Sequence, residues 1–479
     1  MKNIFILYLL ILLPLAGFNQ GTKSKSSTEI VILHVNDMHC RIDQFPVLSA
    51  MIQDIKAKHK NVILVSAGDL FSGNPIVDKF PEKGFPMIDL MNALSFDVST
   101  LGNHEFDYGP QVLAKRISEA KFTFIVANMQ PKIKDFPQLQ PYKNYKFDKI
   151  KLVLLGITQV EPQGYPDTRP ENCKDFDFTQ GITKVKEFSW LSGKSNIFTV
   201  LSHMGVQEDS LLATQLPEIV AIIGGHSHTV LQTPMKVNGV TIVQTGCYLK
   251  YLGMLTISLK GKKVISVRDT LLPLKGYFHS DSLIAKKVDT YNNNKEFKKI
   301  AGYLGTALHG DNELGGLMAD ASLRAVKADF SFQNSGGIRI TELPAGAITI
   351  KQIYELDPFA NEIMICKMTT AQMRELIEYG YKKEKKADMI SAGINSLIYL
   401  NPDKSVAKIE LLLPNGSAPD ENNVYKVAIN NYVTSSYKFS KTGEAIGTGV
   451  TTTDALIRLL SLIKSVNYSG VVSTKLITK

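Results

Sequence analysis

The chain has 479 residues, of which 44% are hydrophobic and 21% are charged, and its formal net charge is +9. This length is too great for one ordinary domain and predicts two domains of roughly 150 to 300 residues each. The composition is that of a soluble globular protein with ample apolar surface to bury. No run of Lys and Arg is dense enough to indicate a nucleic-acid polymer as partner, so the positive charge fits either an anionic small-molecule substrate or a merely basic surface.

The first twenty residues have the pattern of a secretory signal peptide. Lys2 precedes a nearly unbroken apolar run from Ile4 to Phe18, after which residues 19–21 are polar or Gly. The run is short for a membrane span. We therefore expect residues 1–20 to be a signal peptide and the mature protein to be periplasmic or secreted, without a stable membrane span. An uncleaved N-terminal anchor is the alternative.

The four cysteines are widely spaced and form no Cys-x-x-Cys pair; they are Cys40, Cys173, Cys247 and Cys366. An oxidising compartment permits disulfides, but the spacing does not reveal the pairing. The same spacing argues against a zinc site built from thiolates.

From residue 28 to residue 274, short apolar runs rich in β-branched residues alternate with segments of helical pattern. The runs predict seven strands at Ile30–Val35, Val62–Val65, Val98–Leu101, Phe122–Val126, Leu152–Ile157, Ile197–Leu201 and Ile219–Ile223. Helices are predicted at Phe45–His59 and Gln111–Ala120, and Leu252–Leu274 predicts a hairpin that turns at residues 260–262. This alternation predicts a layered α/β domain with buried strands.

A second unit follows a polar segment, Asp281–Lys299, which fits either a linking helix or a solvated connector. We expect the linker at residues 275–302 and the second domain at residues 303–479. Within that domain, helices are predicted at Gly315–Lys327, Thr370–Lys383 and Thr453–Ser465, and strands at Ala328–Gln333, Ala407–Leu413 and Val424–Asn430. The pattern predicts a smaller mixed α+β domain.

Candidate metal ligands follow five of the strands predicted in the first domain. They lie in Asn36-Asp37-Met38-His39, Gly68-Asp69, Gly102-Asn103-His104-Glu105, Ser202-His203 and Gly224-Gly225-His226-Ser227-His228. Loops at the carboxyl ends of strands in an α/β sheet converge on one crevice, so we expect these side chains to meet. Carboxylate, imidazole and amide oxygen together suit Zn, Mn, Co or Fe(II). Each residue alone would fit a helix cap, a turn or a buried histidine, but their joint occurrence favours a metal site.

The five ordered blocks resemble those of the calcineurin-like metallophosphoesterases. The version Gly-Asn-His-Glu-Phe-Asp at residues 102–107, followed by a second domain, resembles the 5'-nucleotidase branch, which includes UDP-sugar hydrolases and 2',3'-cyclic nucleotide phosphodiesterases. The resemblance covers nearly the whole chain after residue 28. It implies a four-layer αββα sandwich, a C-terminal substrate-binding domain that rotates to deliver a nucleotide, and two divalent metal ions. We would place the hinge at residues 276–302.

The resemblance also implies a role for each residue of the five blocks. One metal ion would be held by Asp37, His39 and His228, the other by Asn103, His203 and His226, and Asp69 would bridge the two ions. His104 and Asp107 match the catalytic His–Asp pair of the family. In that pair the carboxylate orients the imidazole, which stabilises charge on the phosphoryl group as the leaving group departs.

Substrate contacts are expected mainly in the second domain. Residues 333–339 resemble the Asn-Gly-Gly-Gly-Ile-Arg block of the branch, which implies nucleotide contacts by Asn334, Gly336, Gly337 and Arg339. Phe359 matches the family's base-stacking ring, and Tyr432 is the candidate for the second ring, although it fits a core residue equally well. Asn128, at the end of a predicted strand, would either contact substrate or end the strand in a turn.

One departure weakens the prediction of nucleotide specificity. Relatives usually carry Gly-Gly-Asp shortly after the second aromatic residue, where the Asp binds ribose hydroxyls, whereas this chain has Thr-Ser-Ser-Tyr-Lys at residues 434–438. The sequence thus predicts a phosphoester hydrolase, with 5'-nucleotidase activity as the first expectation. UDP-sugar or dinucleotide hydrolysis, 2',3'-cyclic phosphodiesterase action with 3'-nucleotidase action, and a non-catalytic nucleotide-binding surface protein are the alternatives.

Overall fold

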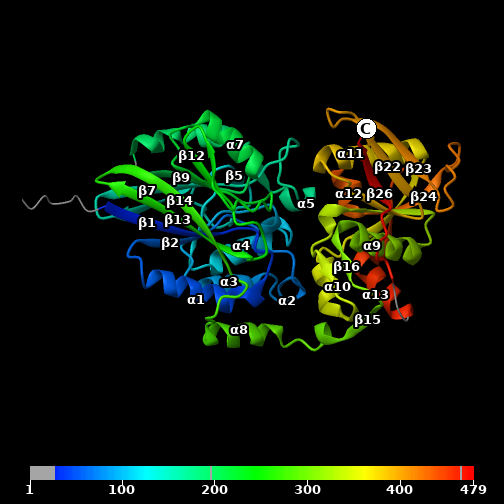
Figure 1. Cartoon of the computed structure of the whole chain (residues 1–479), viewed down its shortest axis with the longest axis horizontal. Helices are drawn as coiled ribbons and strands as arrows, with labels where there is room; N and C mark the ends of the chain where they lie inside the picture. The colour runs from blue at the N-terminus through cyan, green and yellow to red at the C-terminus, as the bar shows by residue number, and fades with distance from the viewer. Residues whose placement is uncertain (1–26, 195–196, 464–466, 479) are drawn as a thin grey trace, which may run out of the picture.

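The computed structural model of the chain describes residues 27–194, 197–463 and 467–478. The expected signal peptide lies outside the described residues. Two bodies lie side by side, and helix α8 (Ser282–Asn292) runs beneath the first of them on the way to the second (Figure 1). Each body has its own clusters of buried apolar side chains.

Two six-stranded sheets form the centre of the first body. The first sheet has the strand order β14 (Lys263–Pro273), β13 (Tyr251–Lys260), β1 (Ser27–Val35), β2 (Val62–Ser66), β3 (Val98–Ser99) and β4 (Thr123–Phe124). The second has the order β11 (Met235–Val237), β12 (Val240–Val243), β10 (Ala221–Ile223), β9 (Ile197–Ser202), β7 (Ile150–Ile157) and β6 (Tyr142–Phe147).

The two sheets face each other across a core of aliphatic side chains. Ile32 and Val65 of the first sheet belong to the same buried cluster as Leu154 and Ile223 of the second. The outer face of the first sheet packs against α1 (Phe45–Lys56), α3 (Phe85–Ala93) and α4 (Pro110–Glu119), and that of the second against α6 (Gly181–Glu187) and α7 (Val206–Gln215). The predicted four-layer αββα sandwich is confirmed.

Strand direction places the loops of the site. Strands β1 to β4 run parallel to one another, as do β7, β9, β10 and β12. The predicted hairpin is present as β13 and β14, which join at residues 261–262. Because consecutive parallel strands end at the same edge of a sheet, the loops that follow them come together there.

The polar segment after β14 is a helix rather than a solvated connector. Asp281 caps the N-terminus of α8 through the N–H groups of Leu283 and Ile284. Its other carboxylate oxygen accepts hydrogen bonds from Ser49 and Gln53 of α1. The first part of the expected linker is therefore docked on the first body.

The second body contains a five-stranded sheet that packs against three helices in one buried cluster and against two helices and a smaller sheet in another. The strand orders are β21 (Met389–Ala392), β17 (Phe330–Asn334), β24 (Tyr425–Asn430), β20 (Glu362–Met368), β25 (Ile446–Thr451), and β23 (Val406–Leu412), β22 (Asn395–Leu400), β26 (Thr474–Thr478). The helices are α9 (Gly310–Val326), α10 (Ile350–Leu356), α11 (Thr370–Glu384), α12 (Asn431–Ser436) and α13 (Thr452–Leu462). The predicted mixed α+β domain is confirmed.

Two further expectations concern disulfides and membrane spans. All four cysteines are free thiols, three of them buried. Within the described ranges, the chain has no helix that combines the length and apolar character needed to cross a membrane.

Candidate metal centre and substrate cavity

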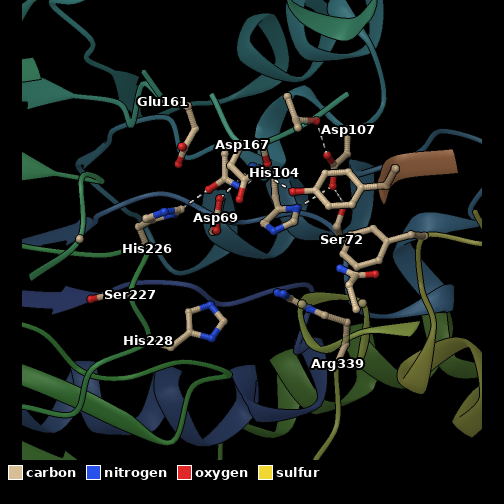
Figure 2. Close-up of a pocket in the computed structure, with 18 of the residues that line it drawn as sticks. Asp69, Ser72, His104, Asp107, Glu161, Asp167, His226, Ser227, His228 and Arg339 are labelled. Carbon is tan, nitrogen blue, oxygen red and sulfur yellow. Dashed lines mark hydrogen bonds and ion pairs between the residues drawn. The ribbon is translucent and has the colours of Figure 1, made fainter. Parts of the chain in front are cut away.

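The candidate ligands follow strands of both central sheets. Asp37 and His39 come after β1, Asp69 after β2, and His203 directly after β9, all almost completely buried. His226 and His228 follow β10 and Asn103 follows β3. Figure 2 shows Asp69, His226 and His228 facing a common space.

Six of the seven expected ligands fall into two groups that share one carboxylate. Ligand atoms of Asp37, His39, Asp69 and His228 lie within 4.8 Å of one another, and so do those of Asp69, His203 and His226. Asp69 is thus placed where a bridging ligand would stand.

The seventh residue, Asn103, presents its amide oxygen to the second group. Its Oδ1 lies 3.0 Å from Nδ1 of His226 and 3.3 Å from Nε2 of His203. The sequence-based division into two sets of ligands therefore coincides with the division in space.

The ligand loops adopt backbone conformations that side chains rarely take. Asp37, His39, Asp69, His226 and His228 all have φ between 44° and 74°. Left-handed non-glycine residues cost free energy and persist where the surrounding structure imposes them, commonly at functional sites.

Gly102 shows why the loop after β3 needs a glycine. A Cβ at Gly102 would lie 2.1 Å from Oδ1 of Asp69. No side chain fits at that distance, so the close approach of the loop to Asp69 depends on this glycine.

Neighbouring groups orient the ligands. Nδ1 of His203 lies 2.6 Å from the carbonyl oxygen of Ala67, and Nδ1 of His39 lies 2.9 Å from that of Ser72. With Nδ1 engaged, Nε2 is the nitrogen of each ring that could bind a metal ion. The buried carboxylate of Glu105 accepts the N–H groups of Asp69, Leu70 and Gly102, so it ties two ligand loops together. Burial and the charge of Asp69 raise the pKa of Glu105 to about 7.

The histidines of the centre differ in their affinity for protons. Burial and the charge of Arg339 hold the pKa of His39 well below its ordinary value. Burial and the neighbouring His203 lower the pKa of His226 to about 4. Burial also disfavours charge on His203, but Asp69 and Asp37 outweigh it and raise its pKa to about 9. Neutral His39 and His226 have a free ring lone pair, as a metal ligand requires.

The donor set fits divalent metal ions. Nε2 of His39 lies 3.0 Å from Nε2 of His228, and Oδ1 of Asp37 lies 3.3 Å from the same atom of His228. Lone-pair donors that converge at such distances inside a protein are stabilised by a cation between them. Imidazole, carboxylate and amide oxygen suit Zn, Mn, Co or Fe.

His104 and Asp107 form a pair beside these two groups. Nδ1 of His104 lies 2.7 Å from Oδ2 of Asp107, and the Asp107 carboxylate also accepts hydrogen bonds from Ser72 and Thr168. Burial lowers the pKa of His104, but Asp107 and Asp69 outweigh it and raise the pKa above its ordinary value.

A cavity of about 1030 Å³ lies between the two bodies, above the metal centre. Six expected substrate-binding residues of the second body line it together with Asp69, His104 and His228, namely Asn334, Gly336, Gly337, Arg339, Phe359 and Tyr432. Arg339 points into the cavity (Figure 2), and its Nη2 lies 2.8 Å from Nε2 of His39. Its buried Nε has no hydrogen-bond partner among the described residues.

The two rings expected to stack on the base, those of Phe359 and Tyr432, make different contacts in this structure. Phe359 stacks on the His104 ring, with centroids 5.6 Å apart and an angle of 22° between the planes. Tyr432 donates its hydroxyl hydrogen to Asp167 of the first body.

Asn128 does not reach the cavity, so its expected substrate contact is not supported. Its Nδ2 donates to the carbonyl oxygens of Thr158 and Thr179, and its Oδ1 accepts the N–H of Thr158. The Asn128 side chain thus joins the backbone segments at Thr158 and Thr179.

Sequence reasoning did not identify Ser72, Glu105, Asp167 or Thr168 as part of the site. A signal for Glu105 exists, because it lies within the Gly-Asn-His-Glu-Phe-Asp block. Asp167 and Thr168 lie in an irregular loop, where no strand or motif marks them.

Comparison with known proteins agrees with this architecture. The sequence profile of the calcineurin-like phosphoesterases matches residues 30–230, and that of the 5'-nucleotidase C-terminal domain matches residues 295–439. By fold and by site, the first body is therefore a calcineurin-like phosphoesterase domain. More particularly, the chain belongs to the family in which this domain is joined to a 5'-nucleotidase C-terminal domain.

Three known proteins illustrate the similarity. The trifunctional nucleotide phosphoesterase protein YfkN of Bacillus subtilis is 28% identical over 85% of this chain, which spans 32% of YfkN. The human 5'-nucleotidase is 26% identical over 85% of this chain and 83% of its own length. The crystal structure of a 5'-nucleotidase precursor from Thermus thermophilus has the same fold, with a TM-score of 0.83 at 22% identity, and covers 94% of this chain and 99% of that chain.

Proposed function

We propose that the protein is a secreted 5'-nucleotidase that depends on two divalent metal ions and hydrolyses nucleoside 5'-monophosphates to nucleoside and phosphate. The observation that carries this proposal is the shared cavity, in which Arg339 and Phe359 of the second body face Asp69 and His228 of the first. The names of relatives such as the human 5'-nucleotidase support a nucleotide as substrate.

The metal ions would occupy the two groups of ligands that share Asp69. Asp37, His39 and His228 would hold one ion, and Asn103, His203 and His226 the other. When bound, such a pair of ions supplies a water of lowered pKa and neutralises charge on the phosphoryl oxygens.

The residues around the ions would bind and orient the ester. Arg339 presents a fork of N–H donors suited to two non-bridging phosphate oxygens. The His104 ring, held by Asp107, donates a hydrogen bond to the phosphoryl group and stabilises its negative charge as the ester bond breaks. Phe359 and Tyr432 hold the base, while the ribose lacks the acidic partner that relatives provide.

A substrate panel tests the reaction. The purified protein is assayed with AMP, UDP-glucose, 2',3'-cyclic AMP and bis(p-nitrophenyl) phosphate, with Mn, Zn or Co added. We expect the highest kcat/KM with AMP. Strong turnover of the cyclic ester or of UDP-glucose beside inactivity on AMP would instead support the corresponding alternative.

Metal analysis separates the enzyme from a nucleotide-binding surface protein. We expect two divalent ions per chain and loss of activity in EDTA, reversed by added metal. Fewer than two ions, together with no EDTA-sensitive activity, would contradict the proposal and favour the binding protein. Fractionation of producing cells tests the location, which we expect to be periplasmic or extracellular.

A further inference from the structure

Three consecutive residues of an irregular loop, Asp167, Thr168 and Arg169, contact the site from the side. The hydroxyl of Thr168 donates to Oδ1 of Asp107 over 2.8 Å. The backbone oxygen of Asp167 accepts a hydrogen bond from Nδ2 of Asn103 over 3.0 Å. With its NH₂ group held there, Asn103 turns its Oδ1 toward the histidines of the second ligand group.

The same loop binds the second body. The Asp167 carboxylate accepts hydrogen bonds from Nζ of Lys383 at 3.0 Å and from the hydroxyl of Tyr432. Nη2 of Arg169 donates to Oδ1 of Asn361 over 2.7 Å. Neighbouring residues of one short segment therefore contact both the second body and the site residues Asn103 and Asp107.

The loop is further fixed within the first body. The N–H of Asp167 donates to Oε1 of Gln159 at 2.8 Å, and Thr168 is 4% exposed. Asp167 and Lys383 are both about one-fifth exposed at their side chains. Removal of Lys383 would leave this largely buried carboxylate without its counter-charge, with the Tyr432 hydroxyl as its remaining side-chain donor from the second body, which favours a shift of the loop.

We propose that residues 167–169 are a positioning segment, through which contact with the second body aligns Asp107 and Asn103 for catalysis. Asp167 lines the cavity together with His104 and Asp107 (Figure 2). The positioning segment touches no reacting atom, so its effect passes through the residues that it holds. This inference rests on the proposed phosphoesterase function.

Thr168 provides the first test. Thr168→Val removes the hydrogen bond to Asp107 and keeps the shape of the side chain, whereas Thr168→Ser keeps the hydroxyl. Because a hydrogen bond to a charged group is involved, we expect Thr168→Val to lower kcat about tenfold or more and to leave KM within about twofold. Thr168→Ser should have a kcat close to that of the wild-type protein. Unchanged kcat in Thr168→Val, or an equal loss in both variants, would overturn this part of the proposal.

A double-mutant cycle tests the link to the second body. Asp167→Asn, Lys383→Gln and the double variant are compared for kcat, KM and the affinity for Mn measured by calorimetry. We expect each single variant to lower kcat. Each should also weaken the binding of Mn to the ligand group that contains Asn103 about tenfold, within the range for residues that orient metal ligands. The double variant should be no worse than either single variant, because both remove the same contact.

Lys382→Gln is the matched control, since Lys382 pairs with Glu378 on the exposed side of the same helix. It should leave kcat and both Mn affinities unchanged. Losses that add in the double variant would overturn the proposal, because Asp167 and Lys383 would then act independently. A raised KM with unchanged kcat and Mn affinity in Lys383→Gln alone would also overturn it, because Lys383 would then act directly on substrate. If the wild-type protein hydrolyses no phosphate ester, the proposed function fails, but the Mn affinities still test the positioning segment.

Discussion

Nη2 of Arg339 lies 2.8 Å from Nε2 of His39, although 300 positions separate the two residues in the sequence. Through this contact the second body reaches the metal centre of the first. A guanidinium close to a bound metal ion is unfavourable unless an anion lies between them, and a phosphate group would provide that anion.

Arg339→Lys keeps the positive charge but loses the planar fork that binds two phosphate oxygens. We expect kcat/KM for AMP to fall about 10- to 100-fold, corresponding to about 1.4 to 2.7 kcal/mol of transition-state stabilisation. Arg324→Lys is the control, because Arg324 is 62% exposed on α9. Steady-state kinetics check the result, and wild-type kinetics in Arg339→Lys would exclude a phosphate-binding role.

Phe359→Ala separates recognition of the base from the reaction itself. Loss of one stacking surface costs about 1–3 kcal/mol per base, so KM for AMP should rise about 5- to 160-fold. Turnover of p-nitrophenyl phosphate, which has no base, should stay within about threefold of wild type. Since Phe359 also stacks on His104, Phe359→Leu serves as a packing control. Equal losses with both substrates would show that the ring supports His104 instead.

Asp69→Asn should abolish turnover, because both groups of ligands share this carboxylate. We expect a loss well above the roughly 10- to 100-fold typical of residues outside the first coordination sphere. Elemental analysis should find fewer than two ions per chain. Asp289→Asn, at an exposed position of α8, controls for loss of a surface charge. Unaltered activity in Asp69→Asn would be incompatible with the two-metal assignment.

Asp209 predicts a pH dependence of stability. It is fully buried; its Oδ1 accepts a hydrogen bond from Ser202, whereas its Oδ2 has no partner among the described residues. Burial raises its pKa to about 7 in the folded protein, against about 3.9 in an unfolded chain. Between these values the folded state keeps a proton that the unfolded state has released, so the free energy of unfolding falls as pH rises.

Asp209→Asn removes this titrating group and keeps an oxygen for Ser202. The variant should unfold at higher urea concentration than wild type at pH values above about 7, and the difference should shrink toward about pH 4. Urea unfolding at a series of pH values measures it. A wild-type protein whose stability rises steadily over this range, together with an Asp209→Asn variant that is never more stable, would contradict the prediction.

Local sequence patterns are sufficient to predict the strands that precede the candidate ligands. The strand before Asp37 is predicted at Ile30–Val35 and ends at Val35 in β1, because a continuous apolar run with a polar stop is visible without knowledge of its neighbours. The strand before His226 is predicted two residues too long at its start, since β10 begins at Ala221. Asn128 is ambiguous in the sequence because the same amide suits a substrate or a backbone, and its partners come from distant segments.

The position along the chain of the strands that precede the ligands, the polar loops at their ends and the presence of a second domain can be inferred from residue type and spacing. The assignment of the seven candidate ligands depends also on the resemblance of the five sequence blocks to a known family. Three-dimensional packing was needed to establish that α8 docks on the first body, that Glu105 ties two ligand loops together and that Arg339 faces His39. It also revealed the contacts of Asp167 with Lys383 and Tyr432, which are 216 and 265 positions away. Such pairs depend on how two separately packed bodies meet, and no local pattern encodes that relationship.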